Sequence, residues 1–271
     1  MKKTAALLIL ALCLTLCAGF ALPAAAEAGN APEGNKLALD MVILVDISDT
    51  MKTNDSNFYR LEAAAMIIGM CDYENSRIAL VPFGTDVYTN PKIHLAALYS
   101  DRLYNLTEAS SFESKKGIVT GTVRDCITSL LVDTDNRVRE EYGGATALGA
   151  ALKYGVNLLK PTAKDSGNQK VVVLLTDGKI DLPTAGGKSG QQLMQEDTQK
   201  FNAAYQQAKD YGVKVYTVAL KEKDVKLLQD ASRATGAPET KVVDNAEDLP
   251  DVFNSFLSLE NPTLGVGFGI A

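Results

Sequence analysis

Apolar residues along this chain gather in short, nearly continuous runs that are separated by longer segments of mixed polarity. The main runs are rich in β-branched residues and lie at 39–47, 77–83, 171–176 and 214–220, and a shorter one lies at 241–243. Because successive residues are apolar, each run is typical of a strand that is covered on both faces. The pattern therefore predicts a buried, parallel sheet.

The segments between these runs carry apolar residues three and four positions apart, which is the spacing of one helix face. They lie at 58–71, 148–159, 191–211, 225–234 and 246–259. Strands that alternate with helices predict an α/β fold with a doubly wound, mostly parallel central sheet flanked by helices. We find no internal repeat and expect one domain over residues 37–260.

One stretch departs from this regular alternation. A short edge strand is expected at 93–99, and a helix is expected at 118–131. Polar runs surround that helix, so residues 100–142 are interpreted either as two helices or as an insertion into the domain.

The first 28 residues have the pattern of a secretory signal peptide. Lys2 and Lys3 precede an apolar run at 5–22, and small residues follow it. Cleavage after Ala26 or after Ala28 fits this pattern, and an uncleaved membrane anchor is the alternative.

Flexible segments are expected on both sides of the domain, at 29–36 and at 261–271. Apart from the leader, no apolar stretch reaches the ~18 residues that a membrane span needs. We therefore expect a secreted or cell-surface protein without a membrane span after cleavage, and the short leader indicates a bacterial source.

Composition narrows the function classes. The formal net charge of −6 disfavours a broad electrostatic surface for nucleic acid or anionic lipid. The single histidine, His94, would have to serve any His-containing zinc site or Ser-His-Asp triad. Of the four cysteines, Cys13 and Cys17 lie in the leader. Cys71 and Cys126 either form one disulfide or are two small buried side chains.

Hydroxyl and carboxylate side chains occur at the ends of the expected elements. The first strand leads into Asp46-Ile-Ser48-Asp-Thr50, and the strand at 171–176 leads into Asp177-Gly178. Thr146 precedes the helix at 148–159. Because doubly wound sheets bind ligands at the carboxyl ends of their strands, we expect these loops to meet at one edge of the sheet.

Each of these residues also has an ordinary structural explanation. Ser48, Asp49, Thr50 or Thr146 could be a helix N-cap, and Asp177-Gly178 could be a plain turn. Together, however, they offer two carboxylates and three hydroxyls, which are hard oxygen donors. This set suits Mg²⁺, with Mn²⁺ or Ca²⁺ as alternatives, and disfavours zinc because it lacks thiolate and imidazole.

The pattern Asp46-x-Ser48-x-Thr50, followed by Thr146 and by Asp177-Gly178, resembles the metal-ion-dependent adhesion site (MIDAS) of the von Willebrand factor type A domain family. The likeness extends over about residues 38–258. It implies that Ser48 and Thr50 bind the metal directly and that Thr146 binds it directly or through water. It also implies that Asp46 and Asp177 act through water.

The same resemblance implies a metal-dependent module for protein binding or adhesion, and not an enzyme. An Asp or Glu of a protein partner would complete the coordination sphere, because hydroxyls and water leave most of the ion's charge uncompensated. The sequence leaves the oligomeric state open. A structural domain whose metal only orders the loops is the alternative.

The end of the first strand is also similar to the Asp-x-Asp-x-Thr signature of haloacid dehalogenase-like phosphatases. Ser48 stands where those enzymes have their general acid, so this interpretation is disfavoured. Two positions depart from the usual type A pattern, since Thr50 replaces Ser and Ala145 replaces Gly. The additional acid Asp49 would either raise cation affinity or point outward, and we expect it to point outward.

Overall fold

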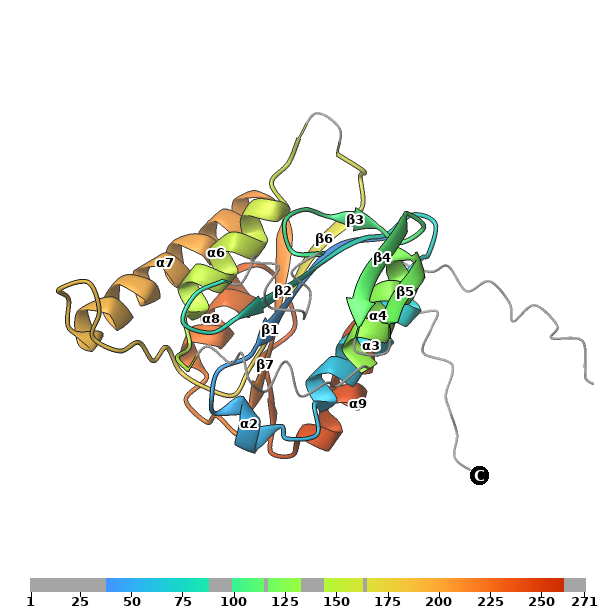
Figure 1. Ribbon diagram of the computed structural model, residues 1–271. Coiled ribbons are helices and arrows are strands. Elements are labelled where there is room, and N and C mark those ends of the chain that lie inside the picture. Colours follow the sequence, from blue (N-terminus) through green and yellow to red (C-terminus); the bar gives the residue numbers. More distant parts are fainter. Residues whose placement is uncertain (1–37, 88–98, 115–116, 133–143, 163–164, 261–271) are drawn as a thin grey trace, which may run out of the picture. The chain divides into compact units, whose positions relative to one another are not determined.

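The computed structural model describes residues 38–87, 99–114, 117–132, 144–162 and 165–260 (Figure 1). The described residues belong to one compact unit, Lys36–Ala271. The expected leader at 1–28, the segments at 29–36 and 261–271, His94 and nearly all of the edge strand at 93–99 lie outside the described residues.

Within the described residues, a six-stranded sheet has the order β3-β2-β1-β6-β7-β8. Its strands are β1 (Leu39–Asp46), β2 (Arg77–Phe83), β3 (Tyr104–Asn105), β6 (Gln169–Thr176), β7 (Val213–Leu220) and β8 (Lys241–Val243). Neighbouring strands are parallel except for β2 and β3. The predicted doubly wound, mostly parallel sheet is confirmed.

Helices cover both faces of this sheet (Figure 1). One face carries α3 (Tyr59–Met70), α4 (Val123–Val132) and α9 (Leu249–Glu260), and the other carries α6 (Leu148–Leu158), α7 (Gly190–Asp210) and α8 (Lys226–Ala234). The short helix α2 (Met51–Asn54) precedes α3, and the 3-10 turn η2 (Ala246–Asp248) precedes α9.

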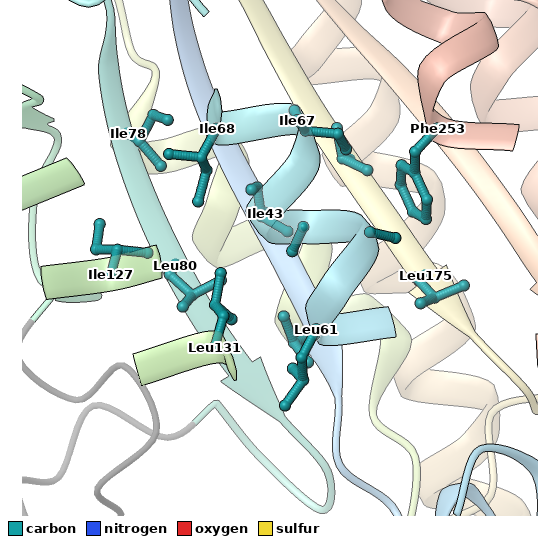
Figure 2. Close-up of a cluster of buried hydrophobic side chains, with 14 of the residues drawn as sticks. Ile43, Leu61, Ile67, Ile68, Ile78, Leu80, Ile127, Leu131, Leu175 and Phe253 are labelled. Atoms are coloured by element: carbon teal, nitrogen blue, oxygen red, sulfur yellow. The ribbon is translucent and has the colours of Figure 1, made fainter. Parts of the chain in front are cut away.

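Alternate residues of β1 face opposite layers, which fixes this strand between two hydrophobic clusters. Ile43 belongs to the cluster that contains Leu61 of α3 and Phe253 of α9 (Figure 2). Val42 and Leu44 belong to the other cluster, under α6 and α7. Full burial of such a side chain contributes about 1.5–3 kcal/mol, so the carboxyl end of β1 is held firmly in place.

The helix expected at 118–131 begins later than predicted. Residues 118–122 instead belong to β5 (Gly117–Thr122), which pairs with β4 (Ala109–Ser114) in an antiparallel hairpin. The prediction was wrong here because the segment is rich in β-branched residues, which favour a strand, and contains two Gly residues, which disfavour a helix. In the described part of 100–142, one helix, α4, follows this hairpin.

Both cysteines of the described chain are buried and free. Cys71 is the C-cap residue after α3 and Cys126 lies in α4, and both belong to the hydrophobic cluster of that face. Burial raises the pKa of the Cys71 thiol to about 12. The interpretation as small buried side chains is therefore confirmed.

None of the helices in the described ranges is long and apolar enough to cross a membrane.

The carboxyl ends of β1 and β6 meet where the winding of the sheet reverses. Strand β1 lies between β2 and β6. Helix α3 connects β1 to β2 across one face, whereas α6, which precedes β6, packs on the other face. Doubly wound sheets bind ligands at such a reversal, and the residues that follow β1 and β6 are the ones singled out from the sequence.

Candidate metal centre

Asp46 ends β1 and joins it to the end of β6. Its side chain is fully buried. Oδ1 accepts the backbone N–H of Ser48 at 2.8 Å, and Oδ2 accepts the hydroxyl of Thr176, the last residue of β6, at 2.6 Å. These bonds fix the carboxylate and tie the first loop to the neighbouring strand.

The hydroxyl of Thr50 links the first loop to the loop after β6. It donates a hydrogen bond of 2.8 Å to Oδ1 of Asp177 and lies 3.2 Å from the hydroxyl of Ser48. Thr50 occupies the N-cap position of α2, yet its side chain makes no capping hydrogen bond. The N-cap explanation therefore fails for this hydroxyl.

Asn54 is a residue of this site that the sequence reasoning missed. Its Nδ2 donates to Oδ2 of Asp177 at 2.8 Å. The signal was the spacing, because Asn54 lies four positions after Thr50 and residues at i and i+4 share one side of a helical turn. Thr50 and Asn54 thus hold one oxygen each of the Asp177 carboxylate.

Thr146 lies in a loop that contacts both of the others. Its backbone N–H donates to the carbonyl of Asp181 at 2.9 Å, and the N–H of Asp181 returns a bond of 3.1 Å. A Cβ built on Gly178 would lie 3.7 Å from Oγ1 of Thr146, so this hydroxyl lies beside the residue that follows Asp177. The N-cap of α6 is Ala147, so Thr146 is not the N-cap residue.

A buried carboxylate from another helix fixes the start of α6. Asp197 of α7 accepts the backbone N–H of Gly149 at 2.7 Å and that of Ala150 at 3.0 Å. A Cβ at Gly149 would come within 2.0 Å of the Asp197 carbonyl oxygen, so this close approach requires glycine. The bonds hold the N-terminus of α6, and therefore the adjoining Thr146 loop, against α7.

Asp49 points outward, as predicted. Its side chain is 57% exposed and forms an ion pair of 2.7 Å with Lys52. Its backbone N–H donates to the carbonyl of Gly144 at 3.3 Å, which links the first loop to the Thr146 loop. Gly144 has φ +65°, a conformation that favours glycine, so the Gly before Ala145 has a structural role.

The two acids of the site lie in an environment that opposes their ionisation. Burial, and then the negative charge of Asp177, raises the pKa of Asp46 to about 6. Burial also raises the pKa of Asp177, although Asn54, Thr50 and the charge of Arg60 act against it. Both carboxylates therefore lack part of the positive charge that would stabilise their ionised forms, and a cation at this edge would supply it.

The residues predicted as metal ligands are brought together from three loops at one edge of the sheet. They are Asp46, Ser48, Thr50, Thr146 and Asp177, and four of them are buried while Thr50 is exposed. Across the described ranges, no cluster of three or more His, Cys, Asp and Glu side chains could hold a metal. The five predicted ligands do not form a cluster of that type, because three of them are hydroxyl residues. Hydroxyl and carboxylate oxygens are hard donors, which fit Mg²⁺.

Residues 125–255 match the family model of the von Willebrand factor type A domain. The match includes Thr146 and Asp177, whereas the first loop precedes it. No curated protein matches the sequence.

Solved structures share the fold at low sequence identity. Proximal thread matrix protein 1 from the mussel byssus is 17% identical with a TM-score of 0.53, covering 83% of this chain and 48% of that chain. A second structure of the byssus protein, with a TM-score of 0.52 and the same identity and coverage, has a zinc-occupied MIDAS motif.

Two further structures come from bacteria. A von Willebrand factor type A protein from Catenulispora acidiphila is 15% identical with a TM-score of 0.54, covering 82% of this chain and 42% of that chain. A mutant of the PilB minor pilin from Streptococcus sanguinis is 18% identical with a TM-score of 0.53, covering 87% of this chain and 65% of that chain. This chain spans about half the length of the byssus protein. The family-model match confirms the predicted resemblance to the type A family.

Proposed function

We propose that this chain, whose residues 125–255 match the von Willebrand factor type A domain, is an exported protein-binding module that holds its partner through a divalent cation. Ser48, Thr50 and Thr146 would supply hydroxyl ligands, and Asp46 and Asp177 would act through water. The cation is Mg²⁺ in this proposal, with Mn²⁺ or Ca²⁺ as alternatives, because the donors are hard oxygens. A partner's Asp or Glu completes the coordination sphere.

The observation that carries this proposal is the hydrogen bond between Thr50 Oγ1 and Asp177 Oδ1. It brings a hydroxyl from the loop after β1 to the carboxylate that follows β6. Neither residue acts as a simple local cap or turn residue, because Thr50 bonds across the sheet edge and Asp177 accepts from Thr50 and Asn54. A ligand site explains why polar groups from three loops are placed together here.

The exposure of the site favours a partner that approaches from solvent. Thr50 is exposed while Ser48 behind it is fully buried. A cation held by neutral hydroxyls, with the two carboxylates acting through water, would keep an open side toward Thr50, where a carboxylate from another protein would bind. The whole chain is acidic, with formal charge −6, so the cation would be the local attraction for an acidic group.

The extracellular location rests on the leader pattern of residues 1–28. Two of the structural relatives are a byssus thread matrix protein and a pilin. This chain is proposed to work outside the cytoplasm in the same way, as a binding protein and not as an enzyme. In a phosphatase of the haloacid dehalogenase type, Ser48 would have to act as a general acid, which a hydroxyl does poorly.

The first experiment measures Mg²⁺ and Mn²⁺ binding by titration calorimetry. The wild type is compared with Asp177→Ala, with the isosteric Asp177→Asn, and with Asp210→Ala as an exposed acid at the end of α7. Both Asp177 variants should lose metal binding, while Asp210→Ala should keep it. Equal affinity in the wild type and the folded Asp177→Asn variant would overturn the site assignment.

The alternative function is a structural domain whose metal only orders the loops. Chelation separates the two, because it should abolish partner binding in an adhesive module. In a structural module, chelation would lower the melting temperature and leave binding to the same partner intact.

A further inference from the structure

A cavity of about 390 Å³ opens beside the candidate metal centre. Its walls are the loop after β6, helix α7 and the beginning of α8. Its apolar lining consists of Leu148, Ile180, Met194, Leu227 and Leu228. A volume of this order lies within the range of protein pockets that bind small ligands, so it also has room for a long side chain.

The cavity borders two of the loops that carry the candidate metal ligands. Gly178, which lines it, follows Asp177 directly, and Leu148 lies two positions after Thr146. The paired hydrogen bonds between Thr146 and Asp181 hold the two loops together at this boundary. A segment that placed a carboxylate on the cation would therefore have neighbouring residues at the mouth of the cavity.

The charged residues that line the cavity carry an excess of negative charge. They are Glu222, Asp224 and Asp230 against Lys179 and Lys226. Lys226 pairs with Asp230 at 2.6 Å, and Lys179 lies 3.2 Å from Asp224 and 3.9 Å from Glu222. Glu222 also accepts the backbone N–H of Asp224 at 2.6 Å. The three acids and two lysines of the lining therefore leave one negative charge in excess.

We propose that this cavity binds a Lys or Arg side chain of the same partner segment whose Asp or Glu reaches the metal. The aliphatic stem would pack against the apolar lining residues and the cationic end would reach Glu222 and Asp224, since long basic side chains combine these two properties. The partner's recognition segment is then an acidic residue with a basic residue at a fixed, short spacing. This proposal rests on the proposed metal-dependent binding.

The experiment selects a random peptide library displayed on phage against the immobilised protein, in Mg²⁺ and in EDTA. The wild type is compared with Asp177→Ala and with the double variant Glu222→Gln/Asp224→Asn, which removes two charges and keeps the shapes. A selected peptide is then synthesised with Arg and with neutral citrulline, and both affinities are measured. Thermal melting checks that each variant is folded.

The expected result is Mg²⁺-dependent enrichment of Asp or Glu together with Lys or Arg at one spacing. The double variant should keep the acidic preference and lose the basic one. The exchange of Arg for citrulline should weaken binding to the wild type about tenfold and leave binding to the double variant unchanged.

Two other results would contradict the proposals at different levels. Enrichment of an acid accompanied by apolar or random neighbours would overturn the basic-residue site and leave metal-dependent binding intact. A lack of Mg²⁺-dependent acidic enrichment, with the same peptides selected by Asp177→Ala, would overturn the proposed function itself and the cavity proposal with it.

Discussion

Thr50 Oγ1 and Asp177 Oδ1 lie 2.8 Å apart, although 127 positions separate the two residues in the chain. The contact exists because β1 and β6 are parallel neighbours whose carboxyl ends leave the sheet at the same edge. The hydroxyl can keep donating to the carboxylate while its oxygen binds a cation. The bond therefore orients the Thr50 oxygen toward the candidate metal centre.

Replacement of Thr50 by Val should weaken metal binding at least about tenfold, because Val has nearly the same shape but offers no oxygen. One lost charge-assisted hydrogen bond is worth about 1.5–3 kcal/mol, and a lost metal ligand adds to it. Titration calorimetry with Mg²⁺ and Mn²⁺ measures the effect. Thr53→Val is the matched control, since Thr53 is exposed on the same short helix. Equal losses in the two variants would contradict a specific role for Thr50.

Gly149→Ala should destabilise the protein by about 3 kcal/mol or more. The added methyl would approach the Asp197 carbonyl oxygen to 2.0 Å, and relief of this clash would displace α6 from α7. Because the Thr146 loop adjoins the start of α6, metal affinity should fall as well. Chemical denaturation and metal titration of the same sample measure both effects.

Gly69→Ala is the control for this change. Gly69 lies within α3, and a Cβ there would meet its nearest atom, the Arg124 guanidinium, at an ordinary 3.9 Å. Alanine is the better helix former by about 1 kcal/mol, so this variant should be as stable as the wild type or more stable. A Gly149→Ala protein with wild-type stability would show that α6 and α7 can separate without cost.

Sequence reasoning located the main strands and the site loops because both depend on local patterns. The apolar runs that became β1 and β6 are buried on both faces, and such strands are visible without knowledge of their neighbours. Their ends could then be placed at one edge of the sheet by the general topology of doubly wound folds. The polar residues at those ends followed directly.

Other features were harder to predict because their local signals are weak or absent. In β5 every residue is exposed or half-buried, so β5 lacks the buried apolar run that marks the main strands and only its β-branched residues favour a strand. Asn54 reaches Asp177 across 123 positions, and Asp197 reaches Gly149 across 48. The spacing places Asn54 on the same side of the turn as Thr50, but the atoms that these side chains contact become evident only when the packing of the elements is known.

Two acids close to the first loop should respond differently to removal of their charge. Asp55→Asn should cost about 3–5 kcal/mol, because Asp55 pairs with Arg60 at 2.7 Å and both side chains are fully buried. Asp49→Asn should change stability by less than about 0.5 kcal/mol, because its pair with Lys52 is exposed. Urea denaturation compares the two substitutions. An equal cost would contradict this difference in burial.

Asp49→Asn also tests the outward orientation. If the carboxylate lies away from the cation, metal affinity should stay within about twofold of the wild type. A tenfold loss would show instead that this acid contributes to cation binding.

Asp40 lies at the opposite end of β1, and it should make the free energy of unfolding depend on pH in the acid range. Burial alone raises the pKa of this carboxyl, but hydrogen bonds from Arg77, Ser166 and Asn168 and the charge of Arg77 together hold the pKa below its usual 3.8. Arg77 Nε donates to Oδ1 at 2.8 Å, and the Ser166 hydroxyl donates to Oδ2 at 2.7 Å. The ionised form is therefore favoured in the folded protein.

A carboxyl whose pKa is lower in the folded state than in the unfolded state stabilises the fold above the unfolded pKa, near 3.9. That contribution is lost as the pH falls through the folded pKa. Asp40→Asn should accordingly lower the free energy of unfolding by about 1.5–3 kcal/mol at pH 7, with a difference from the wild type that shrinks below about pH 4. Urea denaturation of both proteins between pH 7 and pH 3 measures this difference.

Because burial raises the pKa of Asp197 and gives it the opposite pH dependence, the variant must be compared with the wild type at each pH. A difference that stays constant across the range would contradict the role of the Asp40 charge.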